Sequence, residues 1–159
     1  MNSGQTHALA KVDGQLGKFA EDPLWQRLWL NLESQSWRSL AVMPVGDASS
    51  IDLVHALAAV AWQQRGTPVI VADLRSIGLP ALASARGELR RRVQNGERVL
   101  IGMNSLDTNP TSATIAREAD KALLCVILGQ TMRSQVRNAV RELGAQRCLG
   151  SILIRIKGY

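Results

Sequence analysis

Five short aliphatic runs, separated by segments with helical periodicity, constrain the fold of this chain more than any other feature. An aliphatic run without polar alternation predicts a strand that is buried on both faces of a sheet. Strands that alternate with helices are joined by crossover connections, which make the sheet parallel. The predicted strands are 39–45 (SLAVMPV), 69–71, 98–102 (RVLIG), 122–128 (ALLCVIL) and 148–156, and the predicted helices between them are 50–65, 80–95, 111–120 and 131–143.

We therefore expect an α/β fold of three layers, in which a mostly parallel sheet carries helices on both faces. The chain of 159 residues suits one domain. Apolar residues make up 46% of it but aromatic residues only 4%, so its core must consist mainly of Ala, Val, Ile and Leu. Residues 1–20 have little apolar pattern, which predicts a flexible N-terminal tail before a single domain over residues 21–159.

The net charge and the cysteine content rule out few classes of function, and neither of them identifies a binding site. The formal net charge of +6 suits nucleic acid, anionic lipid or an acidic protein. Cys125 and Cys148 lack the spacing of a metal site, so no metal is expected. No signal peptide is recognisable, and no apolar run reaches the ~18 residues of a membrane span. We expect a cytoplasmic protein, with attachment to the inner membrane through a partner left open.

The segment 23–32 (PLWQRLWLNL) predicts an amphipathic helix before the first strand. Asp22 is a suitable N-cap and Pro23 suits the first turn. The apolar stripe of this helix favours packing on the domain or on a neighbouring copy. The interface candidates are Trp25, Leu28, Trp29, Asn31 and Leu32 on this helix, together with Arg86, Arg90 and Arg91 on the helix 80–95.

The order of these segments resembles the cytoplasmic domain of bacterial tyrosine kinases of capsule and exopolysaccharide systems. These kinases are relatives of the MinD/ParA-type P-loop ATPases, so the resemblance implies a truncated P-loop NTPase-like fold over residues 23–158. The family begins with a helix of the pattern E-x-F-R-x-L-R-x-N-L, whose charges contact neighbours in a ring. Here Pro23, Gln26 and Trp29 stand at the charged positions, which puts the ring in doubt.

The family's phosphate loop, P-G-E-G-K-S-T, aligns with residues 45–51 (VGDASSI). Gly46 and Ser50 match it, and Asp47 stands at the glutamate. Ala48 replaces the second glycine, which lets the backbone approach the phosphates. Ser49 replaces the lysine that reaches the β- and γ-phosphates, and Ile51 replaces the last hydroxyl. The sequence thus predicts a degenerate phosphate loop at residues 46–50.

The resemblance also places a former metal site at the ends of two later strands. Asp73 in the segment VIVADLR keeps one of two acidic residues of the family. Gly102 stands where the family's magnesium-organising aspartate would be, and Ile154 stands at the base-contacting asparagine. Phosphoryl transfer needs both a positive group and a held Mg²⁺. Because these groups are replaced together, no catalytic residue, ATPase activity or tyrosine kinase activity is expected.

The resulting hypothesis is a non-catalytic pseudo-kinase that acts as a binding or scaffolding subunit in exopolysaccharide synthesis or export. The resemblance implies docking on an inner-membrane co-polymerase of the Wzz type, with homo-oligomers as a further option. No cofactor is expected, although a helix N-terminus attracts anions, which leaves weak ATP or ADP binding open. The sequence is also compatible with an atypical ATPase or tyrosine kinase, and with a MinD/ParA/RecA-like regulator of cell division or DNA. Direct nucleic-acid binding is not expected.

Overall fold

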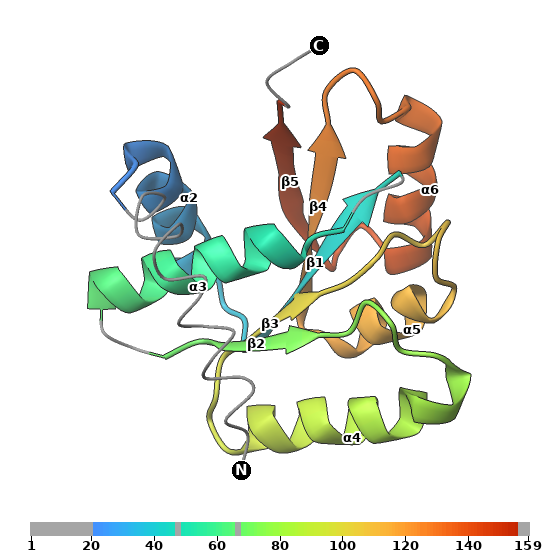
Figure 1. The fold of residues 1–159 in the computed structure, drawn as a ribbon, viewed down its shortest axis with the longest axis horizontal. Helices are drawn as coiled ribbons and strands as arrows, with labels where there is room; N and C mark the ends of the chain where they lie inside the picture. Colours follow the sequence, from blue (N-terminus) through green and yellow to red (C-terminus); the bar gives the residue numbers. More distant parts are fainter. Residues whose placement is uncertain (1–20, 47–48, 66–67, 156–159) are drawn as a thin grey trace.

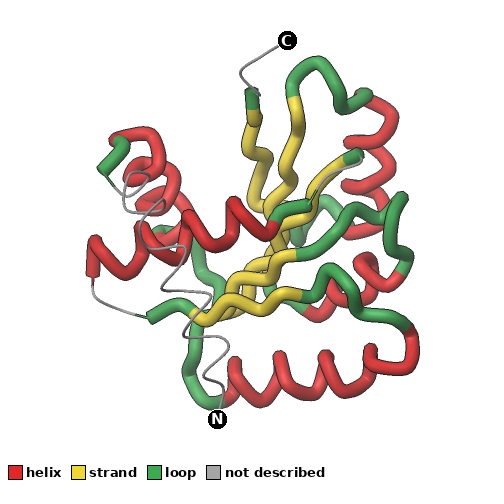
Figure 2. Tube along the Cα trace, viewed as in Figure 1, coloured by secondary structure: helices red, strands yellow, loops and turns green. Residues whose placement is uncertain are grey.

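The computed structural model describes residues 21–46, 49–65 and 68–155. The predicted tail at 1–20 and two residues of the predicted phosphate loop, Asp47 and Ala48, lie outside the described residues. Within the described part, helices and strands alternate along the chain as the sequence predicts (Figures 1 and 2). The elements, labelled as in Figure 1, are α2 (Pro23–Glu33), β1 (Ser39–Val45), α3 (Ile51–Arg65), β2 (Ile70–Asp73), α4 (Leu79–Gln94), β3 (Val99–Gly102), α5 (Thr111–Glu118), β4 (Lys121–Ile127), α6 (Arg133–Leu143) and β5 (Cys148–Ile154).

The described strands form one sheet of five strands in the order β2-β3-β1-β4-β5. All four pairings between neighbouring strands are parallel. β1 lies at the centre, where it pairs with β3 on one side and β4 on the other. This arrangement confirms the predicted α/β fold with a parallel sheet.

Helices cover both faces of the sheet, which completes the three predicted layers (Figure 1). One core cluster joins α2 and α3 to side chains such as Leu40 and Val42 of β1. The other joins α4, α5 and α6 to side chains such as Ala41 and Met43 of the same strand. Every residue of β1 is buried, because successive side chains enter the two clusters in turn.

Helix α2 begins where the sequence predicts and ends at Glu33. The Asp22 carboxylate caps it by accepting a hydrogen bond of 2.8 Å from the Leu24 N–H. Beyond its end, the indole of Trp37 donates to the Leu32 carbonyl at 2.7 Å and meets Trp29 edge to face at 6.1 Å between ring centroids. These aromatic contacts fix α2 against the first core cluster.

No helix in the described part of the chain combines the length and the hydrophobicity that a membrane crossing requires.

Candidate functional site

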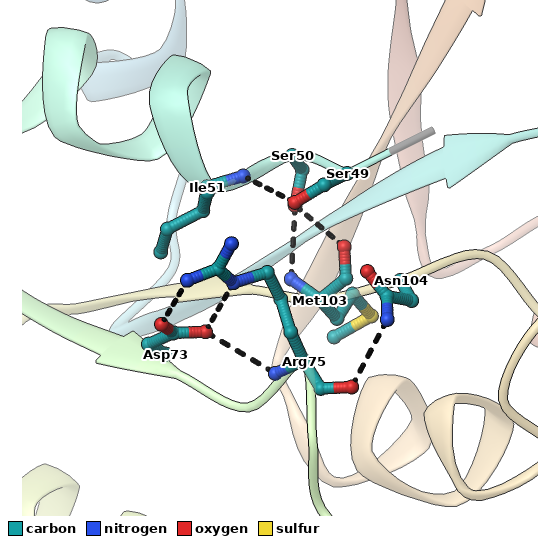
Figure 3. A network of polar contacts seen from close by, with 7 residues as sticks. All are labelled: Ser49, Ser50, Ile51, Asp73, Arg75, Met103 and Asn104. Carbon is teal, nitrogen blue, oxygen red and sulfur yellow. Dashed lines mark hydrogen bonds and ion pairs between the residues drawn. The ribbon is translucent and has the colours of Figure 1, made fainter. Parts of the chain in front are cut away.

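The candidate site lies where β1, β2 and β3 end, and Figure 3 shows it from close by. After β1 the chain enters α3 on one face of the sheet, and after β3 it enters α5 on the other face. In open parallel sheets, ligands bind in the crevice that such diverging connections leave at the carboxyl ends of the strands. The predicted phosphate loop and the predicted former metal site both belong to this place.

Gly46, the glycine that matches the phosphate-loop motif, has a positive φ of 93° directly after β1. A residue with a Cβ would be strained in that conformation. The turn after β1 therefore needs glycine at this position for backbone reasons alone, whether or not a phosphate binds. The match at Gly46 does not by itself indicate a nucleotide site.

Ser50, the second match to the motif, is bonded to the end of β3. Its hydroxyl accepts a hydrogen bond of 2.9 Å from the Met103 N–H and donates one of 3.2 Å to the Met103 carbonyl. The Ser50 N–H donates to the same carbonyl at 3.2 Å. Ser50 is only 1% exposed, so it joins two segments of the protein and does not face a ligand.

The neighbouring loop residues use their polar groups within the protein in the same way. Ser49 forms an antiparallel bridge with Asn104, and its hydroxyl accepts a hydrogen bond of 3.3 Å from the Ile51 N–H. A phosphate loop binds its anion with free backbone N–H groups at the start of a helix. Here the N–H groups of Ser50 and Ile51 are bound to the protein, and Asp52 adds a negative charge in the first turn.

Ile51 fills the space in which an acidic side chain at position 102 would lie. A Cβ added to Gly102 would come within 2.7 Å of Ile51 Cδ1 and 3.3 Å of Ile51 Cα. Ile51 is 7% exposed and stands at the last hydroxyl of the phosphate-loop motif that residues 45–51 resemble. A side chain at position 102 would therefore have to displace Ile51, so these two residues are packed closely against each other.

Asp73, the acidic residue that remains at the predicted metal site, is engaged by Arg75. The two side chains form a bidentate ion pair of 2.9 and 2.7 Å, and the Arg75 N–H donates to the same carboxylate at 3.2 Å. These hydrogen bonds hold the pKa of Asp73 below its usual value. In the described part of the chain, no three His, Cys, Asp or Glu side chains lie close enough together to hold a metal ion.

The turn that carries Arg75 is held by the loop after β3. Asn104 donates from its side chain to the Arg75 carbonyl at 3.1 Å (Figure 3). Asn109 and Thr111 donate to the Ile77 carbonyl at 3.1 and 2.8 Å. The ends of β2 and β3 are thus tied together by side-chain hydrogen bonds, and the guanidinium stays over Asp73.

His55 lies one turn into α3 from the loop. Burial lowers its pKa, while the negative charges of Asp73 and Asp52 oppose that shift. Its Nδ1 is buried and has no hydrogen-bond partner among the described residues. Burial therefore favours the neutral imidazole, and no nucleophile among the described residues is bonded to Nδ1.

The interface candidates on α2 divide into an inner and an outer group. Trp29 and Leu32 are 2% and 4% exposed and belong to the core of this domain. Trp25 and Leu28 are partly buried against the same core, whereas Asn31 is exposed. The inner side chains stabilise the domain, so only the outer face of α2 can contact a partner.

The arginine candidates on α4 are paired with acidic side chains. Arg86 and Arg90 both bond to Glu118 of α5, Arg90 at 2.9 Å. Arg91 bonds to Glu88 within α4 at 2.7 Å. The three arginines therefore join α4 to α5 or stabilise α4 itself, and much of their charge is already neutralised.

A pocket of about 530 Å³ opens beside the end of β1, between α5 and α6. Its lining combines one arginine with two acidic residues, so the charged groups do not favour an anion. Sequence reasoning missed this pocket, because its residues come from three separate segments. The polar and glycine residues that line it include Gly46, Ser105, Asp107, Gln135, Asn138 and Arg141.

Sequence reasoning also missed that Arg75 neutralises Asp73. The spacing Asp-x-Arg was visible in ADLR and could have suggested an Asx-type turn with a paired arginine. Comparisons with family models, with curated proteins and with solved structures found no match.

Proposed function

We propose that this domain is a non-catalytic binding or scaffolding subunit of bacterial exopolysaccharide synthesis or export. In this proposal it has a P-loop-like architecture without nucleotide chemistry, and it docks on an inner-membrane co-polymerase. The resemblance of residues 23–158 to the cytoplasmic kinases of these systems supports the pathway and the partner. The packing of Ile51 against Gly102 carries the non-catalytic part of the proposal.

This contact matters because a metal ligand at position 102 would have to displace the side chain of Ile51. Phosphoryl transfer depends on a cation that bridges the phosphates and on a positive group that neutralises the developing charge. At this edge of the sheet, hydrocarbon occupies the ligand position, and Arg75, the cation beside it, is bound to Asp73. This arrangement supports the proposal that the crevice does not hold Mg²⁺ and triphosphate.

The enzymatic part is tested by assaying the purified full chain for ATP hydrolysis and for tyrosine autophosphorylation in Mg²⁺. We expect rates that equal the buffer blank and that stay unchanged in the Asp73→Ala variant. Ser50→Ala serves as a second variant, because it removes the hydroxyl that matches the phosphate-loop motif. A robust rate in the wild type that either substitution abolishes would refute the proposal.

The outer face of α2 is the docking surface that this proposal favours. Leu24 and Leu30 are 72% and 52% exposed there, and Trp62 on the adjacent α3 is 58% exposed. Exposed aliphatic and aromatic side chains of this kind are typical of contacts with another protein.

The docking part is tested by coexpressing the chain with the co-polymerase of its own host and measuring co-purification. The Leu24→Gln/Leu30→Gln variant should lose the partner while its melting temperature stays within a few degrees. Leu79→Gln is the matched control, since Leu79 is 75% exposed on α4, on the opposite face of the sheet. If the wild type, the Leu24→Gln/Leu30→Gln variant and the Leu79→Gln variant co-purify equally with the co-polymerase, the outer face of α2 is not the docking surface.

A further inference from the structure

The positive charge of this chain is concentrated in its last quarter. Residues 1–120 contain twelve basic and twelve acidic residues, whereas residues 121–159 contain seven basic residues and one acidic residue. The whole formal net charge of +6 thus belongs to the part of the chain that forms β4, α6 and β5. A strong local excess of one sign indicates a surface that binds the opposite charge.

The single acidic residue of this region does not neutralise the arginines at the carboxyl end of the sheet. Glu142 pairs with Arg117 of α5 at 2.9 Å. Lys121 and Arg147 donate to backbone carbonyls near the opposite end of these strands. Three exposed arginines remain near the ends of β4 and β5 and have no ion pair among the described residues: Arg133, Arg137 and Arg155.

Exposed aliphatic side chains accompany these arginines. Leu128 directly follows β4 and donates its N–H to Ile154 of β5 at 2.9 Å, which places the two strand ends side by side. Ile152 and Ile154 pack in the core with α2 and α3, so Leu153 points to the other face of the sheet, where α6 lies. Leu128, Met132 and Leu153 are 45%, 66% and 62% exposed.

Met132 caps the N-terminus of α6 and Arg133 is the first residue of that helix, so both lie at the same end of the sheet as Leu128 (Figure 1). We define the basic tip as Leu128, Met132, Arg133, Leu153 and Arg155. Arg137 lies one helical turn behind Arg133 on the same stripe of α6. The basic tip thus combines protruding aliphatic side chains with guanidinium groups that form no ion pair among the described residues.

We propose that the basic tip binds the surface of an anionic lipid bilayer directly. The aliphatic side chains would enter the boundary between headgroups and acyl chains, while the arginines contact the lipid phosphates. The binding of a peripheral protein strengthens with the apolar area it buries and with its electrostatic attraction to anionic lipids, and the tip supplies both. These five residues favour lipid over nucleic acid. Their aliphatic side chains suit the bilayer, and none of the five is an aromatic residue on which bases stack. This inference goes beyond the co-polymerase contact and does not depend on it.

The test is co-sedimentation of the full chain with vesicles that contain no protein. One set consists of phosphatidylcholine alone, and in the other about a third of the lipid is phosphatidylglycerol. We expect binding to the anionic vesicles only, weakened by high salt. Arg133→Gln/Arg137→Gln should lower the partition coefficient about fivefold for each arginine removed. Met132→Gln should lower it further without changing the salt dependence.

The matched control is Arg27→Gln/Arg38→Gln, which removes the same charge from exposed positions away from the tip. This variant should bind anionic vesicles nearly as well as the wild type. Equal losses in the two double variants would show that only net charge matters and would overturn the proposal. Binding of a labelled DNA duplex without binding to anionic vesicles would overturn it as well. All variants change exposed side chains, so unchanged melting temperatures verify that each is folded.

Discussion

The contact between Ile51 and Gly102 predicts that alanine at position 102 destabilises the fold. Gly102 is a buried residue in the last position of β3, and its φ lies outside the left-handed region. At an unhindered site of this kind, replacing glycine by alanine stabilises a protein by about 0.4–1 kcal/mol through the unfolded chain. The structure predicts the opposite sign here, because the added methyl group would overlap Ile51.

The size of this destabilisation follows from the two distances between the alanine Cβ and atoms of Ile51. The contact of 2.7 Å to Ile51 Cδ1 can be relieved by a rotamer change, but the contact of 3.3 Å to Ile51 Cα involves the backbone of α3. Overpacking of a well-packed core typically costs about 1–3 kcal/mol. We therefore expect Gly102→Ala to lower the free energy of unfolding by about 1–2 kcal/mol after the gain from the unfolded state is included.

A double-mutant cycle with Ile51→Val tests the cause, because valine lacks the Cδ1 atom. Alone, Ile51→Val should cost about 0.5–1.5 kcal/mol for the lost packing. In that background Gly102→Ala should cost at least about 0.5 kcal/mol less than in the wild type, which is a coupling typical of residues in contact. Urea unfolding followed by circular dichroism gives all four free energies.

The control is Gly87→Ala on α4, where an added Cβ meets nothing within 4 Å. It should stabilise the protein by about 0.5–1 kcal/mol, because glycine is a poor residue inside a helix. If Gly102→Ala were as stabilising as Gly87→Ala, or if the cycle were additive, the steric account of position 102 would be wrong.

Three further outcomes follow from the structure. Trp29→Ala should lower the free energy of unfolding by about 3–5 kcal/mol, whereas Leu24→Ala on the same helix should change it by less than about 0.5 kcal/mol in chemical denaturation. His55 has a pKa below its unfolded value of 6.5, so the unfolded state binds more protons as the pH falls. Stability measured by urea titration should therefore fall with pH below about 6.5, and His55→Gln should flatten that dependence. A thiol reagent should modify Cys148 before Cys125, since Cys125 is 3% exposed and burial raises its pKa to about 12.

The sequence predicted the layers of this fold because its strands are aliphatic runs with clear ends. The run at 39–45 coincides with the observed β1, and β4 and β5 lie within two residues of their predictions. The strand order was not predictable in the same way. It depends on which strands pair across long connections, and aliphatic strands such as β3 and β4 carry no local signal that chooses their neighbours.

The sequence predicted that Ser50, Asp73 and Gly102 follow or end strands, and the structure brings these residues together at one edge of the sheet. The difference of Ser49 and Gly102 from the motifs that the chain resembles was visible in the sequence, whereas the packing of Ile51 against Gly102 was not. Ile51 begins α3 and Gly102 ends β3, and periodicity gives neither the way a helix sits on a sheet nor the register between β2 and β3. For the same reason, the sequence did not show how Asn104 and Arg75 tie the two strand ends together.

Helix α2 shows a different limit of prediction from sequence. Its apolar stripe predicted burial correctly, but the stripe does not tell whether the covering surface belongs to the same domain or to another molecule. The structure buries Trp29 and Leu32 in the domain, where Trp29 meets Trp37. The contact with a partner is therefore a prediction for the opposite side of α2, where Leu24 and Leu30 are exposed.

Thermal melting with and without Mg-ATP tests the central claim most directly, since that claim is that the crevice no longer holds a nucleotide and its metal. A ligand that binds only the folded state adds about 2.7 kcal/mol of stability at 100 times its dissociation constant, which raises the melting temperature by several degrees. We predict that the melting temperature is the same with Mg-ATP, with ATP alone and with buffer. A Mg²⁺-dependent rise that is absent in Ser50→Ala would contradict the account.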